Sequence, residues 1–143
     1  MARGNKKQKL GGSAGQNRKN SDDFLALNIK KPNIKETASG LQYEIIKEGE
    51  GDSPDENSIV IVHQRAMLLG GKVLDDTYKE NSTMEFKLNE TIEGYQEGLM
   101  MMKPGARYKF FVPPELGWGK KGSGGRIGPY AVVIFDVNLV EFY

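Results

Sequence analysis

Apolar and polar residues alternate with a period of two along most of the chain after Gly40. This period is typical of strands that bury one face, because successive side chains of a strand point to opposite sides. Clusters of Gly, Pro, Asn and Asp separate the alternating segments, as turns require. The pattern predicts four or five antiparallel strands, which fall within residues 41–45, 59–68, 83–88, 108–113 and 131–141.

One segment follows a helical period instead. Glu90 and Glu93 favour the positive N-terminal end of a helix, and Pro104 with Gly105 stops it. Together with the strands, a single amphipathic helix predicts an α+β fold in which the helix packs on one face of an antiparallel β-sheet. The apolar residues of the predicted helix are Ile92, Tyr95, Leu99 and Met102.

The first 39 residues lack the alternation of the rest of the chain. Residues 1–20 are rich in Gly, Asn, Gln, Ser and Lys, so we predict a disordered tail that buries too little surface to fold. Residues 21–39 contain a short apolar patch, and we interpret them as a linker that can dock on the domain. Residues 40–143 then form one folded domain, a size that a single core can support.

The charge of the chain also changes at about residue 20. Six of the 20 lysines and arginines lie in residues 1–20, whereas all 19 acidic residues come later. A basic tail is usually a solubilising extension, and the alternative is weak attraction to nucleic acid, ribosomes or an anionic membrane. No aromatic residue lies in residues 1–20, so base stacking by the tail is excluded.

The composition excludes several classes of catalyst. The chain has no cysteine and one histidine, His63, so disulfides, thiol catalysis and multi-histidine metal sites are excluded. We expect His63 to be a hydrogen-bonded structural residue. Asp75 and Asp76 are neighbours on an extended chain, so their carboxylates point apart and do not form a shared acid–base site. No metal and no cofactor is predicted.

No targeting or membrane segment is visible in the pattern. The apolar runs fall well short of the roughly 20 residues that span a bilayer, and the first residues contain no secretory apolar region. We therefore expect a cytoplasmic protein without a membrane span.

The glycine-rich segment from Gly117 to Gly122 formally satisfies the G-x-G-x-x-G spacing of nucleotide-binding proteins. That fingerprint needs a helix immediately afterwards, and the Ser-Gly-Gly and Gly128-Pro129 that follow do not support one. We interpret the segment as a mobile loop that closes over an apolar pocket, and residues 120–125 should move on the nanosecond to microsecond scale.

Several motifs occur together in one order, and in combination they are specific. They are Gly-Leu-Gln-Tyr from residue 40, Val-His at 62–63, Gly-Lys-Val-Leu-Asp at 71–75, Phe-x-Leu at 86–88, Ile-Glu-Gly-Tyr-Gln-Glu-Gly-Leu at 92–99, Met-x-Pro-Gly at 102–105, Val-Pro-Pro-Glu-Leu-Gly-Trp-Gly at 112–119, Ile-Gly-Pro-Tyr-Ala at 127–131 and Phe-Asp-Val-Asn-Leu at 135–139. On these motifs the chain from about Gly40 to Tyr143 resembles the FKBP-type peptidyl-prolyl isomerases. The resemblance implies a twisted antiparallel sheet wrapped around one short helix, and isomerase activity on X-Pro bonds that assists protein folding.

The resemblance also implies the site residues. Asp75, the backbone N–H of Ile92 and the loop residue Trp118 occupy the catalytic positions. Gln64 stands where a tyrosine is typical, and we expect this exchange to weaken the support of Asp75. The changed aromatics also lead us to expect activity below that of members with the full set. The substrate-binding positions are Gln64, Leu74, Met84, Thr91, Tyr95, Ile127, Tyr130 and Phe135.

Such a pocket suits a reaction without an acid, a base or a cofactor. Resonance gives the X-Pro amide its rotation barrier of about 18–20 kcal/mol, and a dry pocket favours the twisted, less polar transition state. The implied ligands are proline-containing polypeptides and tacrolimus-like macrolides. The alternative is a catalytically weak proline-peptide-binding or chaperone module, with the basic tail contacting ribosomes or nucleic acid.

Overall fold

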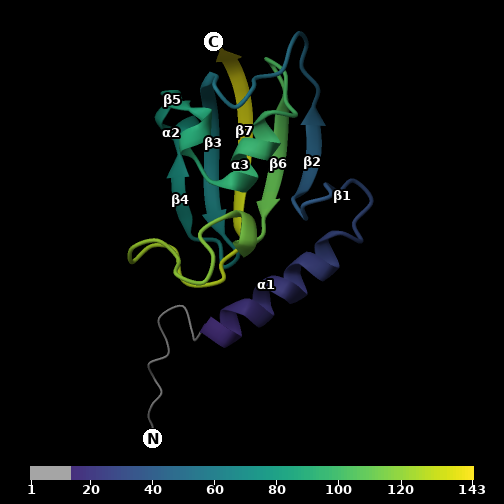
Figure 1. Ribbon diagram of the computed structural model, residues 1–143, viewed down its shortest axis with the longest axis vertical. Coiled ribbons are helices and arrows are strands. Elements are labelled where there is room, and N and C mark those ends of the chain that lie inside the picture. Colours follow the sequence, from purple (N-terminus) through teal and green to yellow (C-terminus); the bar gives the residue numbers. More distant parts are fainter. Residues whose placement is uncertain (1–13) are drawn as a thin grey trace, which may run out of the picture.

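The computed structural model describes residues 14–143, which form one antiparallel sheet with helices on both of its faces (Figure 1). The strand order is β1-β2-β6-β7-β3-β4, and β5 pairs with β3 outside this path. The strands are β1 (Lys35–Glu36), β2 (Gln42–Lys47), β3 (Ile59–Leu68), β4 (Val73–Asp76), β5 (Met84–Lys87), β6 (Arg107–Val112) and β7 (Val133–Phe142).

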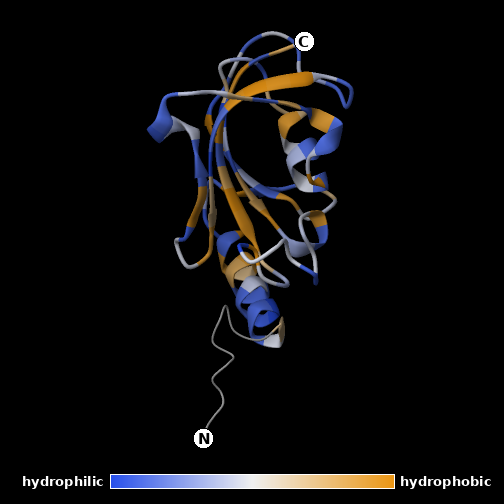
Figure 2. Cartoon of the chain, turned by 90° about the vertical axis from the view of Figure 1, so that its left-hand side faces the viewer, coloured by the Kyte–Doolittle hydropathy of each residue, from blue (hydrophilic) through white to orange (hydrophobic). Residues whose placement is uncertain are grey.

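Helix α3 (Glu93–Leu99) packs on one face of the sheet and closes the main core. Its glycines permit a close approach: a Cβ atom on Gly98 would lie 2.6 Å from the ring of Phe110 in β6. Figure 2 shows the hydrophobic segments of the sheet in orange along this interior. The remaining short elements are α2 (Thr77–Glu80) and two 3-10 turns, η2 (Leu88–Glu90) and η3 (Pro114–Leu116). The predicted α+β fold with an antiparallel sheet and a helix on it is confirmed.

Helix α1 (Ala14–Asn28) lies against the other face of the sheet, below the strands in Figure 1. Phe24 and Leu25 pack on a second cluster formed by Phe111, Val132 and Ile134. The two clusters lie on opposite faces because successive strand residues alternate, as Phe110 and Phe111 do in β6.

Residues 14–20 correct the prediction of a disordered tail over residues 1–20, because they form the first half of α1. Residues 21–28, predicted as linker, complete this helix. Its contacts were hard to foresee because two short polar side chains, Ser21 and Asn28, are almost fully buried and hydrogen-bonded. Residues 1–13 of the predicted tail lie outside the described residues.

Gln42 also departs from the predicted alternation. It was expected on the polar side of its strand, yet it is 3% exposed. Its side chain donates to the carbonyl of Leu25 over 3.0 Å and accepts from the amide of Asn28 over 2.9 Å. Docking of α1 therefore turns the outer face of β2 into an interface.

Within residues 14–143 the helices are too short or too polar to cross a bilayer.

Candidate functional site

A cavity of about 270 Å³ opens between β3, β4, the start of β7 and the loop that follows η3. Its floor is apolar, and one side carries a carboxylate. Six of the predicted site residues line it, namely Gln64, Leu74, Asp75, Trp118, Ile127 and Phe135; Ala66, Ser123, Arg126 and Val133 complete the lining.

The floor of the cavity rests on a pair of stacked aromatic rings. Phe135 of β7 lines the cavity, and the ring of Tyr95 in α3 stacks on it with centroids 4.2 Å apart. Tyr95 is 2% exposed and lies outside the lining, so it supports the floor without forming its surface. The stack fixes the orientation of Phe135 and leaves only an apolar face for a ligand ring.

A chain of hydrogen bonds connects this support to the carboxylate. The hydroxyl of Tyr95 donates to Oε1 of Gln64 over 2.6 Å, and Nε2 of Gln64 donates to Oδ2 of Asp75 over 2.9 Å. Burial raises the pKa of Tyr95 well above its usual value, so its hydroxyl remains a neutral donor. Gln64, at which we expected a weaker support for Asp75, thus supports this carboxylate directly through its side-chain amide.

The loop between η3 and β7 folds back on itself above the cavity. Ser123 and Ile127 form an isolated antiparallel bridge, and the N–H of Tyr130 donates to the carbonyl of Gly119 over 2.9 Å. This arrangement buries most of Ile127 and places it, with the half-buried Trp118, at the rim. The loop therefore has a defined shape, which brings two apolar side chains over the floor.

Two further residues of the same loop line the cavity and were not predicted. Ser123 belongs to the bridge, and the guanidinium of Arg126 donates to the carbonyl of Leu74 in β4. Arg126 therefore joins the loop to the opposite wall. Both residues lie in a glycine-rich segment without periodicity, so no pattern in the sequence indicated which side chains face inward.

Five predicted site residues do not line the cavity: Tyr95, which supports its floor, and four others. Met84 of β5 packs against the main core, while Thr91 and Ile92 precede α3, where the carbonyl of Ile92 accepts the N–H groups of Tyr95 and Gln96. Tyr130 has a left-handed backbone (φ 54°) and lines a different cavity.

The remaining polar candidates have structural partners. Nδ1 of His63 lies 3.0 Å from Oγ1 of Thr77, which supports the expected structural role. Asp76 caps α2 by accepting the N–H of Lys79 over 3.2 Å, whereas Asp75 lines the cavity, so the two carboxylates are separated as predicted. Among the described residues, no group of three or more His, Asp or Glu side chains could hold a metal ion.

Comparison with known proteins places the chain within a described family. Residues 51–140 match the model of FKBP-type peptidyl-prolyl cis-trans isomerases, and residues 2–45 match the model of the domain amino-terminal to these isomerases. The chain is 42% identical over 125 residues to the peptidyl-prolyl cis-trans isomerase Mip of Coxiella burnetii, covering 87% of this chain and 54% of that protein. The chain spans about half the length of the curated relatives it matches.

Solved structures show the same fold. The crystal structure of FkpA from Escherichia coli matches with a TM-score of 0.86 and 32% identity, covering 90% of this chain and 60% of that one. A peptidyl-prolyl cis-trans isomerase from Pseudomonas syringae matches with a TM-score of 0.84 and 27% identity over 92% of this chain and 96% of that chain.

Proposed function

The chain belongs to the FKBP-type peptidyl-prolyl cis-trans isomerase family, and on that premise we propose that it isomerises X-Pro bonds of polypeptide substrates and so assists folding. The observation that carries this proposal is the cavity itself. It combines an apolar floor at Phe135 with one buttressed carboxylate, Asp75, beneath a loop that carries Trp118.

The cavity suits rotation of an amide better than a reaction that transfers protons. An apolar floor holds the proline ring and removes water from the amide. This favours the twisted transition state over the more polar, planar ground state. Asp75, held by Gln64, accepts a hydrogen bond from the substrate or orients the groups around its rotating carbonyl. The indole N–H of Trp118 is a donor at the rim. The backbone N–H of Ile92 remains the proposed donor to a substrate carbonyl.

The test is the cis-to-trans rate of Leu-Pro and Glu-Pro peptides with wild type, Asp75→Ala and Trp118→Ala. We expect acceleration by wild type and a loss of about tenfold in kcat/KM for Trp118→Ala, the equivalent of one net hydrogen bond. Tyr143→Ala is the control, because it removes an exposed aromatic outside the cavity. A wild-type rate equal to the uncatalysed rate would overturn the proposal.

Trp118 is the single tryptophan, so its fluorescence separates catalysis from binding. A fluorescence change with a proline peptide or a tacrolimus-like macrolide, without acceleration of isomerisation, would support a binding or chaperone module instead. The predicted contact of the basic tail with ribosomes or nucleic acid is a separate proposal, supported by charge alone. This proposal requires that the protein binds RNA with an affinity that falls steeply as the salt concentration rises. A cytoplasmic location likewise stays a prediction.

A further inference from the structure

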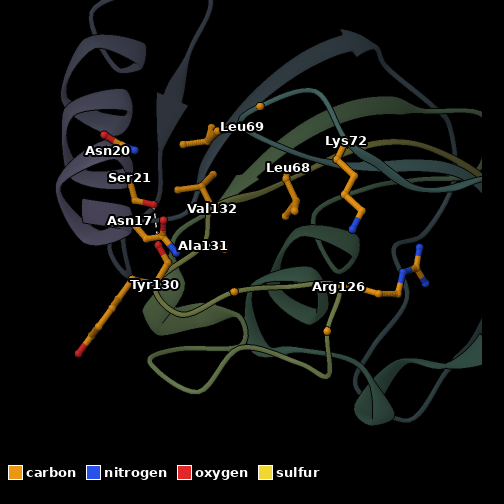
Figure 3. A pocket seen from close by; sticks show the side chains of 13 residues that line it. Asn17, Asn20, Ser21, Leu68, Leu69, Lys72, Arg126, Tyr130, Ala131 and Val132 are labelled. Atoms are coloured by element: carbon orange, nitrogen blue, oxygen red, sulfur yellow. Dashed lines mark hydrogen bonds between the residues drawn. The ribbon is translucent and has the colours of Figure 1, made fainter. Parts of the chain in front are cut away.

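A second cavity lies between α1, the end of β3 and the residues that precede β7 (Figure 3). Its volume of about 690 Å³ exceeds the 270 Å³ of the proposed substrate pocket and lies in the range of ligand-binding sites. We propose that this groove binds the segment of a substrate polypeptide that flanks the isomerised proline, and that it prefers an acidic segment. The inference rests on the proposed function and extends it to substrate choice.

The walls of the groove suit an extended polypeptide. Leu68, Leu69, Ala131 and Val132 form apolar surface, and α1 contributes amide and hydroxyl side chains opposite them. Apolar surface accommodates side chains, while amide groups can donate to and accept from a peptide backbone. Figure 3 shows Asn17, Asn20 and Ser21 at one end and Lys72 and Arg126 at the other.

The charge of the groove indicates the kind of segment that it binds. Lys72 and Arg126 both line it, and within residues 14–143 no Asp or Glu side chain does. Lys72 is exposed at the hairpin between β3 and β4, where its backbone carbonyl accepts the N–H of Leu68 over 2.9 Å. Two cations without lining carboxylates attract an acidic segment and repel a basic one.

The groove adjoins the substrate pocket through one residue. Arg126 lines both cavities, and its guanidinium donates to the carbonyl of Leu74, which is itself a wall of the substrate pocket. A polypeptide with its proline on Phe135 can therefore continue past Arg126 into the groove. This continuity favours a flanking segment of the same chain over an unrelated ligand.

Helix α1 forms a fixed wall of the groove. Nδ2 of Asn17 donates to the backbone carbonyl of Pro129 over 3.0 Å. The hydroxyl of the buried Ser21 donates to the backbone carbonyl of Tyr130 over 2.6 Å. The guanidinium of Arg18 lies 5.2 Å from the centre of the Tyr130 ring. Because these contacts already hold the wall in place, binding a segment orders few protein side chains.

The test uses one Leu-Pro peptide in seven forms: a short form without a flank, and six forms that carry one of three flanks of about six residues, roughly 20 Å when extended, on one side or the other. The flanks alternate leucine with glutamate, serine or lysine, and each is attached on either side of the Leu-Pro pair in turn. We expect the glutamate flank on one side to lower KM about two- to fivefold relative to serine, as one or two exposed ion pairs would. The lysine flank should raise KM.

Lys72→Glu should abolish this preference, because the introduced carboxylate offsets the charge of Arg126, while the short peptide is turned over as by wild type. Lys47→Glu is the matched control: it makes the same charge change at an exposed position in β2 outside both cavities, and should keep the wild-type preference. Equal KM values for all flanks, or equal effects of the two variants, would overturn the inference while leaving the isomerase activity intact.

Failure of the proposed function would be seen separately, as an absence of turnover of the short peptide. In that case direct binding of fluorescently labelled flanks decides the inference. Tighter binding of the glutamate flank, lost in Lys72→Glu and kept in Lys47→Glu, supports the groove as an acidic-segment site. Binding that does not distinguish the flanks overturns it.

Discussion

The side-chain amide of Gln64 donates a hydrogen bond to Asp75 and holds this carboxylate at the wall of the apolar cavity, with Nε2 and Oδ2 2.9 Å apart. The other end of the same amide accepts from the hydroxyl of Tyr95 in α3. Gln64 therefore couples the position of α3 to that of Asp75, the only carboxylate that lines the cavity in the described chain.

Tyr95→Phe should weaken this arrangement without disturbing the aromatic stack on Phe135. Loss of the hydroxyl leaves Oε1 of the buried Gln64 without its donor, so we expect the free energy of unfolding to fall by about 1–3 kcal/mol. Chemical denaturation measures this change. Phe86→Leu is a useful comparison, because it alters a neighbouring ring 5.9 Å from Tyr95 and leaves the hydrogen bonds intact. Unchanged stability and kcat/KM in Tyr95→Phe would contradict the assigned role.

Gly98→Ala should destabilise the protein although alanine favours a helix. The added Cβ would lie 2.6 Å from the ring of Phe110, so α3 must move away from β6. We expect a loss of about 1–3 kcal/mol, as for other overpacked cores, which outweighs the gain of about 1 kcal/mol in helix propensity. Gly70→Ala is the control, since nothing lies within 4 Å of its added Cβ. Higher stability of Gly98→Ala in thermal unfolding would show that α3 is not held this closely.

The sequence predicted the main strands well because their residues alternate and face one core. Residues 59–68 were predicted as a strand and form β3 with the same bounds. The short β1 and β4 were missed, since two and four residues are too few to show a period. Helix α1 was missed for a different reason: it docks partly through buried Ser21 and Asn28, which a hydrophobic pattern cannot reveal.

The site was predictable where the resemblance supplied positions, and less so where the loop decided them. Asp75, Trp118 and Phe135 line the cavity, but Tyr130 faces α1 because its left-handed backbone turns the chain there. The bond from Gln64 to Asp75 depends on the spacing of β3 and β4, which no single-sequence pattern gives. This bond supports Asp75 at the position where we expected a weaker support.

Stability should decline at alkaline pH through Tyr78. Burial, followed by the charge of Asp136, raises the pKa of Tyr78 to about 12 from its usual 10.0. Between these values the unfolded chain has lost a proton that the folded chain keeps, so the free energy of unfolding falls as pH rises. The stabilising contribution is complete below pH 10 and is lost by about pH 12. Urea unfolding from pH 9 to 12 should show a smaller decline for Tyr78→Phe than for wild type or the control Tyr43→Phe. Equal slopes for all three proteins would exclude Tyr78 as the cause.

The shape of the loop over the cavity should depend on Gly122. Its φ of +69° lies in the left-handed region, and a Cβ there would collide with the carbonyl oxygen of Ile127. Gly122→Ala must therefore open the bridge between Ser123 and Ile127, which withdraws Ile127 from the rim. Because such misplacement of a contact residue can reduce turnover about a hundredfold, we expect kcat/KM on a Leu-Pro peptide to fall by about tenfold to a hundredfold.

Gly125→Ala in the same loop is the matched control for Gly122→Ala, since its φ is not left-handed and nothing lies within 4 Å of the added Cβ. Backbone 15N relaxation of residues 119–127 should show lower order parameters in Gly122→Ala than in Gly125→Ala. Measured on the free wild type, the same experiment tests the predicted loop motion: uniformly high order parameters would contradict it. Should Gly122→Ala keep full activity while its order parameters fall, the loop geometry would not control the pocket, and Trp118 and Ile127 would lose their proposed role in holding the substrate.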